Sequence, residues 1–147
     1  MKKILFFLAV AGIVTACSND DDSNRIKPTY DSIKGTWIIS KTIQPDGTLK
    51  NYVGECATKS DSIFFNPYGR KALTYIHSDC DNHFSTLLEG CTGFEITPQD
   101  TLRLCSDLFQ GKITLTKTTL RLDYEETETF SLPKLNNING VIFTRKQ

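Results

Sequence analysis

Apolar and polar side chains alternate with a period of two along most of the chain after residue 33. The clearest case is 119–126, where Leu120, Leu122 and Tyr124 alternate with charged residues. This period is typical of strands that bury one face, and no stretch beyond the first sixteen residues keeps the 3.6-residue period of a helix. The pattern predicts an all-β domain.

Turn residues divide the alternation into eight or nine short strands. The first strand has Trp37, Ile39 and Ile43 on its predicted apolar face and ends at the turn 44–47, and the turn 66–69 joins the next two strands. For 84–89 a helical turn and a covering loop both fit. The predicted strands are 36–43, 61–66, 70–77, 93–96, 101–104, one around Ile113 and Leu115, 119–126, 127–132 and 140–146. Short strands joined by tight turns favour an antiparallel up-and-down β-barrel of about eight strands over a sandwich, because closure removes exposed edges.

The first sixteen residues have a different pattern. A basic start, Met1-Lys2-Lys3, precedes the apolar run 4–14 and then Ala16 and Cys17. This order is typical of a secretory signal peptide, and the run is too short to span a bilayer. A cysteine at the expected cleavage point resembles the lipobox of bacterial lipoproteins, although Val14 and Thr15 depart from its usual residues. We therefore expect 1–16 to be removed and Cys17 to carry diacylglycerol, which anchors the chain in a membrane. Ordinary secretion with an incidental cysteine is the alternative.

Residues 17–32 are polar and acidic, so we expect a lipidated cysteine followed by a disordered tether, with the barrel domain at 33–147. Asp20, Asp21 and Asp22 resemble the acidic export signal that directs lipoproteins of the Bacteroidetes to the outer leaflet. A polar spacer is the alternative. The resemblance implies a lipid-anchored protein of the outer membrane, with exposure on the cell surface as a further expectation.

Charge and composition narrow the classes of function. The chain has 17 Lys and Arg against 17 Asp and Glu, and loss of Lys2 and Lys3 with the signal peptide leaves 15 positive side chains. A nucleic-acid partner is not expected, since a near-neutral chain offers no basic face, and we expect no attraction to anionic surfaces. Apolar residues are 39% of the whole chain but only about a third of the residues after the signal peptide. A thin core suits a small barrel whose interior stays partly open.

Four cysteines remain after Cys17, namely Cys56, Cys80, Cys91 and Cys105. An even number in an exported chain predicts two disulfides. Spacing allows three pairings, but strand parity favours Cys91–Cys105, which share the polar face of one predicted hairpin. Cys56–Cys80 would then be the second bridge. A zinc site is disfavoured because no C-x-x-C pair occurs. The run His77 to His83 has metal-type side chains but fails as a calcium loop, so we expect no metal.

Two ends of the predicted barrel resemble a known family. Lys34-Gly35-Thr36-Trp37 resembles the G-x-W signature of lipocalins, and Phe143-Thr144-Arg145-Lys146 resembles their last strand, whose arginine packs over that tryptophan. Between them Cys56, 62–69, Cys80 and 118–124 are similar to the lipocalin-like domain lipoproteins of Bacteroidetes. The resemblance covers 33–146 and implies a barrel capped by Gly35, Trp37 and Arg145, with a Cys56–Cys80 disulfide. Cys91 and Cys105 lie outside the family pattern.

Motifs for catalysis are missing from the sequence: it has no G-x-S-x-G, P-loop or H-E-x-x-H, so we expect neither an enzyme nor a cofactor. The predicted function is a membrane-anchored lipocalin-like lipoprotein that binds a small hydrophobic or amphipathic ligand at the cell envelope. Tyr52, Tyr68 and Tyr75 are candidates for lining a mouth, although the ligand-binding residues are not predicted. The alternative is a protein-binding envelope lipoprotein, an inhibitor or accessory subunit, with a closed barrel and partner-binding loops at 48–60 and 78–90.

Overall fold

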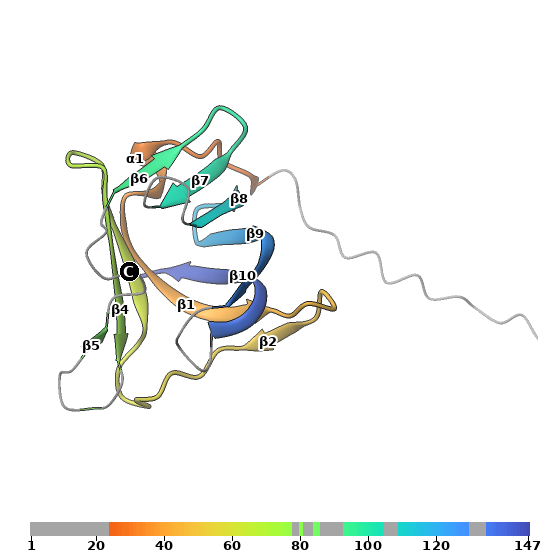
Figure 1. The fold of residues 1–147 in the computed structure, drawn as a ribbon. Helices are drawn as coiled ribbons and strands as arrows, with labels where there is room; N and C mark the ends of the chain where they lie inside the picture. The colour runs from red at the N-terminus through yellow and green to blue at the C-terminus, as the bar shows by residue number, and fades with distance from the viewer. Residues whose placement is uncertain (1–23, 78–79, 81–83, 86–92, 105–108, 130–134) are drawn as a thin grey trace, which may run out of the picture.

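A computed structural model describes residues 24–77, 80, 84–85, 93–104, 109–129 and 135–147, and these form one short helix and ten strands (Figure 1). The elements are α1 (Tyr30–Ile33), β1 (Gly35–Ile43), β2 (Leu49–Asn51), β3 (Ser62–Asn66), β4 (Lys71–His77), β5 (Phe84–Ser85), β6 (Phe94–Ile96), β7 (Thr101–Leu104), β8 (Phe109–Leu115), β9 (Thr119–Thr129) and β10 (Asn136–Arg145). No helix in this part of the chain is long and apolar enough to cross a membrane.

The strands form an antiparallel barrel. Their order is β5-β4-β3-β1-β10-β9-β8-β7-β6, so neighbours follow the chain except that β1 lies between β3 and the last strand, β10. On the opposite side β4 and β6 are joined by a bridge between Lys71 and Gly93 and by a hydrogen bond of 2.9 Å from Phe94 N to Arg70 O. The eight strands β1, β3, β4 and β6 to β10 therefore make a nearly closed up-and-down barrel. The predicted all-β, lipocalin-like fold is confirmed.

Period-two alternation places the apolar side chains inside the barrel. On β9, Leu120 and Leu122 pair with Leu115 and Ile113 of β8, and all four are buried. Equivalent residues of the other strands continue the same cluster, which also takes in Ile33 of α1. Burial of these side chains stabilises the folded chain by roughly 25 cal/mol of free energy per Å² of apolar surface removed from water. The core is therefore the direct product of the pattern seen in the sequence.

A bulge in β1 corrects one predicted face. The register between β1 and β10 shifts between Ile39 and Lys41, so Ser40 is an extra residue in the strand. After the bulge Thr42 pairs with Val141 on the inner face, whereas Ile43 pairs with Gly140 on the outer face, where it is only 3% exposed. The prediction that Ile43 shares a face with Trp37 and Ile39 was therefore wrong, because one inserted residue reverses the alternation.

The segment 48–60, predicted as a long loop, contains the short strand β2. Gly47 has a φ of +81°, and Gln44 N donates to Thr48 O at 2.9 Å, which turns the chain back along β1. Leu49 then pairs with Ile43. Figure 1 shows β2 beside β1, at the edge of the barrel. Its side chains are exposed, which explains why no alternation marked it in the sequence.

Contacts with the barrel begin earlier in the chain than the predicted boundary at residue 33. Ile26 forms a bridge with Leu115, and Ile26 N donates to Leu115 O at 2.8 Å. Pro28 is buried, and Thr29 caps α1 through a hydrogen bond with Ser32 N. The few apolar residues of this segment give it a surface to pack, so residues 24–32 lie on the barrel instead of forming a solvated tether.

Two further elements differ from the predictions. Phe84–Ser85 is a strand, β5, where a helical turn and a loop were the alternatives. β9 runs without a break to Thr129, so 119–126 and the first residues of 127–132 belong to one strand. The hairpin of β6 and β7 forms as predicted, with its turn closed by a 2.9 Å hydrogen bond from Thr97 N to Thr101 O. Cys17, Cys91 and Cys105 lie outside the described residues.

Candidate functional site

The three predicted cap residues lie together at one end of the barrel, here called the closed end. Trp37 is fully buried and its Nε1 donates to Ile33 O at 2.7 Å. The guanidinium carbon of Arg145 lies 4.2 Å from the centroid of the Trp37 ring. Gly35, with a φ of +105°, turns the chain into β1 in a conformation that favours glycine.

Arg145 also joins two separate segments of backbone, the junction of α1 with β1 and the turn between β8 and β9. Its Nη2 donates to Ser32 O at 2.6 Å, its Nη1 to Lys34 O at 3.1 Å and its Nε to Lys117 O at 3.1 Å. The guanidinium therefore stacks on the indole, and its N–H groups donate hydrogen bonds to carbonyl groups that lie outside the strands. This arrangement seals the closed end and leaves the opposite end, the mouth, as the candidate site for a ligand.

A pocket of about 380 Å³ lies at the mouth. Thr42 and Ile138, which are buried near the mouth ends of β1 and β10, form its floor, and Ile138 belongs to the core cluster. Tyr52 packs against the same cluster from the side. The polar rim consists of Gln44, Lys50, Asn51 and Asn136, and Val53 adds an exposed apolar side chain. The pocket therefore has apolar surface from Ile138, Val53 and the ring of Tyr52, and a polar, partly cationic rim.

Tyr52 is held in place by a buried aspartate. Its phenol donates to Asp61 Oδ2 at 2.5 Å, and Asp61 is only 2% exposed. The other carboxylate oxygen accepts a 2.8 Å hydrogen bond from His77 N. Burial and the hydrogen bond to Asp61 both raise the pKa of Tyr52. Tyr52 thus keeps its proton and forms a fixed wall between the mouth pocket and a smaller one of about 200 Å³ behind it.

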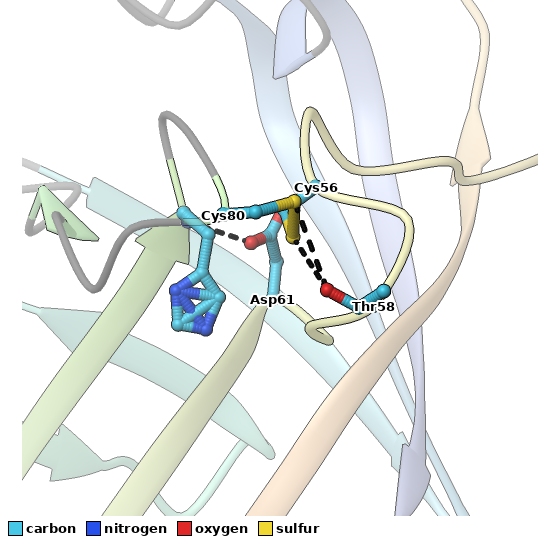
Figure 2. The surroundings of a disulfide bond; sticks show 5 residues. Cys56, Thr58, Asp61 and Cys80 are labelled. Atoms are coloured by element: carbon cyan, nitrogen blue, oxygen red, sulfur yellow. Dashed lines mark hydrogen bonds between the residues drawn. A yellow bond between two sulfur atoms is a disulfide. The ribbon is translucent and has the colours of Figure 1, made fainter.

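The Cys56–Cys80 disulfide, as predicted, ties the loop after β2 to the end of β4. The two Cα atoms are 5.1 Å apart, and 24 residues separate the cysteines in the chain. Figure 2 shows Asp61 beside the bridge, with Thr58 on its other side. Thr58 Oγ1 lies 3.1 Å from Cys56 Sγ and 3.7 Å from Cys80 Sγ. The bridge and the Asp61 hydrogen bonds hold the same loop, so both position Tyr52.

The other chemical candidates from the sequence are not brought together. Tyr68 is 95% exposed in the turn between β3 and β4, and Tyr75 pairs with Ser62 on the outer face. Among the described residues no group of three or more His, Cys, Asp or Glu could hold a metal ion. Of the run 77–83, only His77 and Cys80 belong to this part of the chain, and Cys80 is in the disulfide.

Most residues of the mouth pocket have no signal in the sequence that marks them as part of a site. Tyr52 was a candidate, but Thr42 was hidden by the bulge, and Lys50 lies in the unpredicted strand β2. Asp61 begins a predicted strand, and nothing in the sequence distinguishes a buried aspartate from a solvated one. Comparison of the chain with protein families, curated proteins and solved structures finds no match.

Proposed function

We propose that the protein is a membrane-anchored lipocalin-like lipoprotein, of the kind found in Bacteroidetes, whose barrel mouth binds a small hydrophobic or amphipathic ligand at the cell envelope. The observation that carries the proposal is the mouth pocket between Thr42, Tyr52 and Ile138. Its volume of about 380 Å³ lies within the range of roughly 300–1,000 Å³ that is usual for small-molecule sites.

The lining of the pocket favours an amphipathic ligand. Ile138, Val53 and the ring of Tyr52 offer apolar contact, while Lys50 places an ammonium group at the rim. A ligand with a hydrocarbon portion and a carboxylate or other anionic group satisfies both parts, because the hydrocarbon leaves water and the anion pairs with Lys50. The fixed position of Tyr52 reduces the entropy lost on binding.

The experiment that tests ligand binding is a titration with a fluorescent fatty acid, combined with native mass spectrometry of the protein as purified. Val53→Glu places a negative charge at the rim and is expected to weaken probe binding by about tenfold or more. Tyr68→Glu makes the same kind of change at the closed end and should leave binding unchanged. Absence of probe binding and of a copurifying ligand would argue against the carrier function.

The anchor is tested separately from the ligand. Cells that express the full chain are labelled with radioactive palmitate, and we expect label in the wild type and none in Cys17→Ser. Fractionation should find the wild type with the outer membrane. Absence of label from the wild-type protein would contradict the lipid anchor. The proposed ligand site at the mouth would then belong to a secreted protein without a lipid.

A second candidate function, binding of an envelope protein, rests on β2. All three β2 side chains are exposed, with Leu49 49% exposed and Val53, just beyond the strand, 66% exposed. Exposed apolar side chains on a projecting strand are suited to a protein partner. Crosslinking in cells, compared between the wild type and Leu49→Glu, tests this candidate. A partner lost in Leu49→Glu while the fatty-acid probe still binds would favour the protein-binding function.

A further inference from the structure

The closed end concentrates positive charge that the near-neutral composition conceals. Two exposed lysines flank α1, two exposed cations follow the β3–β4 turn, one lies in the β8–β9 turn and one follows β10. They are Lys27, Lys34, Arg70, Lys71, Lys117 and Lys146. These elements come from four distant parts of the sequence, so only the closed barrel brings their charges together.

Contacts at the cap show that these cations surround one surface. Arg145 bonds to the carbonyls of both Lys34 and Lys117, and Lys146 N donates to Thr36 O at 3.0 Å. The guanidinium carbon of Arg70 lies 5.0 Å from the ring centroid of Tyr30 in α1. The backbones of Lys34, Lys117 and Lys146 and the guanidinium of Arg70 therefore lie around α1 and the cap.

Carboxylates do not balance this surface. The acidic side chains of the described residues at the closed end are Asp31, Glu95 and Asp100. Toward the mouth, by contrast, the exposed or half-exposed charges whose side chains the structure describes are of both signs, with Lys41, Lys50, Lys59 and Arg103 against Asp46, Glu55 and Glu125. Among the side chains that the structure describes, the closed end thus has six exposed cations against three carboxylates, and it is the more positive end of the barrel.

A polar pocket of about 510 Å³ extends this surface along the outside of β8 and β9. It begins at Thr116 and Thr119, which flank the turn that carries Lys117, and it also includes Arg25 and Lys112. Phosphate oxygens accept hydrogen bonds from hydroxyl groups and from cationic side chains, and this pocket contains both kinds of donor. Arg25, Lys112 and Arg121 bring three cations to this pocket, and its one carboxylate, Asp123, lies 2.7 Å from Arg121.

We infer that the closed end docks on the anionic phosphate headgroups of the membrane to which the chain is anchored. This inference rests on the proposed lipidation of Cys17. Cys17 precedes Asn24 by seven residues, which span at most about 25 Å when extended. Asn24 and Arg25 line the pocket next to the closed end, so the anchor keeps the basic surface near the headgroups. The mouth then faces away from the membrane.

The test uses the chain from Ser18 to Gln147, which contains all the residues of the barrel and no lipid. Cosedimentation compares vesicles of equal parts phosphatidylglycerol and phosphatidylcholine with vesicles of phosphatidylcholine alone. We expect binding to the anionic vesicles only, and its loss in high salt. Lys117→Glu with Lys146→Glu should weaken binding by at least about tenfold. Both residues contribute only backbone groups to the contacts at the cap, so the barrel should remain folded.

The matched control reverses two charges near the mouth, with Lys41→Glu and Lys59→Glu, and should bind like the wild type. Equal loss in both double variants, salt-resistant binding, or no binding would overturn the inference. Binding gained only when Asp20, Asp21 and Asp22 are replaced by Asn would also overturn the inference. It would indicate that the basic surface binds this acidic run of the same chain instead of a membrane. Palmitate labelling of Cys17 is independent of all these outcomes, so failure of docking and failure of anchoring are distinguishable.

Discussion

Arg145 and Trp37 are paired in register between β10 and β1, and the guanidinium of the first is stacked on the indole of the second at 4.2 Å. The same two residues therefore join the first strand to the last and seal one end of the barrel. Because strand pairing and end closure depend on one contact, changes at Arg145 affect both.

Replacing Arg145 by Ala is expected to lower the free energy of unfolding by about 2–4 kcal/mol, since the stack and three hydrogen bonds to carbonyl groups are lost together. Arg145→Lys should recover only part of this loss, because an ammonium group does not reproduce the planar fork of the guanidinium. Urea denaturation followed by circular dichroism measures the change. Lys146→Ala removes an exposed neighbouring cation and should leave stability nearly unchanged; a similar loss there would contradict the role of the stack.

Removal of the Cys56–Cys80 bridge is expected to cost about 3 kcal/mol of stability, given the 24-residue separation of its cysteines. The Cys56→Ala, Cys80→Ala double variant should also bind the fluorescent fatty acid less tightly, because the loop that carries Tyr52 is released. Chemical denaturation and probe titration measure the two effects. Unchanged binding with reduced stability would show that the bridge does not position the mouth.

The second predicted disulfide, Cys91–Cys105, can be tested in the same double variant. If these two cysteines are bridged, a reductant lowers the stability of the variant further, by about 2–3 kcal/mol. Peptide mapping under non-reducing conditions should recover the linked peptides. Free thiols at both positions would contradict the prediction from strand parity.

A methyl group at Gly140 is expected to destabilise the barrel. A Cβ there would overlap the carbonyl oxygen of Leu122 and lie 2.8 Å from Ile43 Cδ1, so β9 and β10 would have to separate. We expect Gly140→Ala to lower the unfolding free energy by about 1–3 kcal/mol. Gly93→Ala is the matched control, because a Cβ at Gly93 meets no atom within 4 Å. Equal midpoints of urea denaturation for the two variants would contradict the close approach.

Tyr52 should make stability depend on pH in the alkaline range. Burial and Asp61 raise its pKa in the folded chain above the value of about 10 in the unfolded chain. The folded state therefore keeps a proton that the unfolded state releases, so this contribution is complete below pH 10 and is lost as the pH rises further. Tyr52→Phe should show a smaller decline of stability above pH 10 than the wild type. Tyr68→Phe, which changes an exposed tyrosine, should follow the wild type, and equal slopes in all three proteins would contradict the expectation.

Strands with a regular alternation were predictable because every second side chain is buried, and this pattern is visible within the residues of the strand itself. The inner face of β9 is predicted by the alternation of Leu120, Leu122 and Tyr124 with charged residues. The turn between β6 and β7 is predicted by the turn residues 97–100. The bulge at Ser40 was not predictable, since it depends on how β10 and β2 meet β1. Ser40 supports it with a hydrogen bond from its Oγ to Ile142 O at 2.8 Å, a contact across 102 residues.

The candidate site was harder to predict than the barrel. The Trp37–Arg145 contact was expected from a family resemblance, which carries long-range information that the pattern of one chain lacks. Tyr52 and Asp61 meet in an irregular loop that is bridged to Cys80, and Cys80 follows Asp61 in the chain only after β3 and β4. Burial of Asp61 follows from this assembly and leaves no local signal in the sequence.

The pairing of β1 with β10 also bears on when the chain acquires its shape. Arg145 and Ser32, which share a hydrogen bond, are 113 residues apart, so no early part of the nascent polypeptide can complete the barrel. Topologies dominated by such distant contacts fold slowly compared with helical proteins. The barrel can therefore close only after its last strand, β10, has been synthesised.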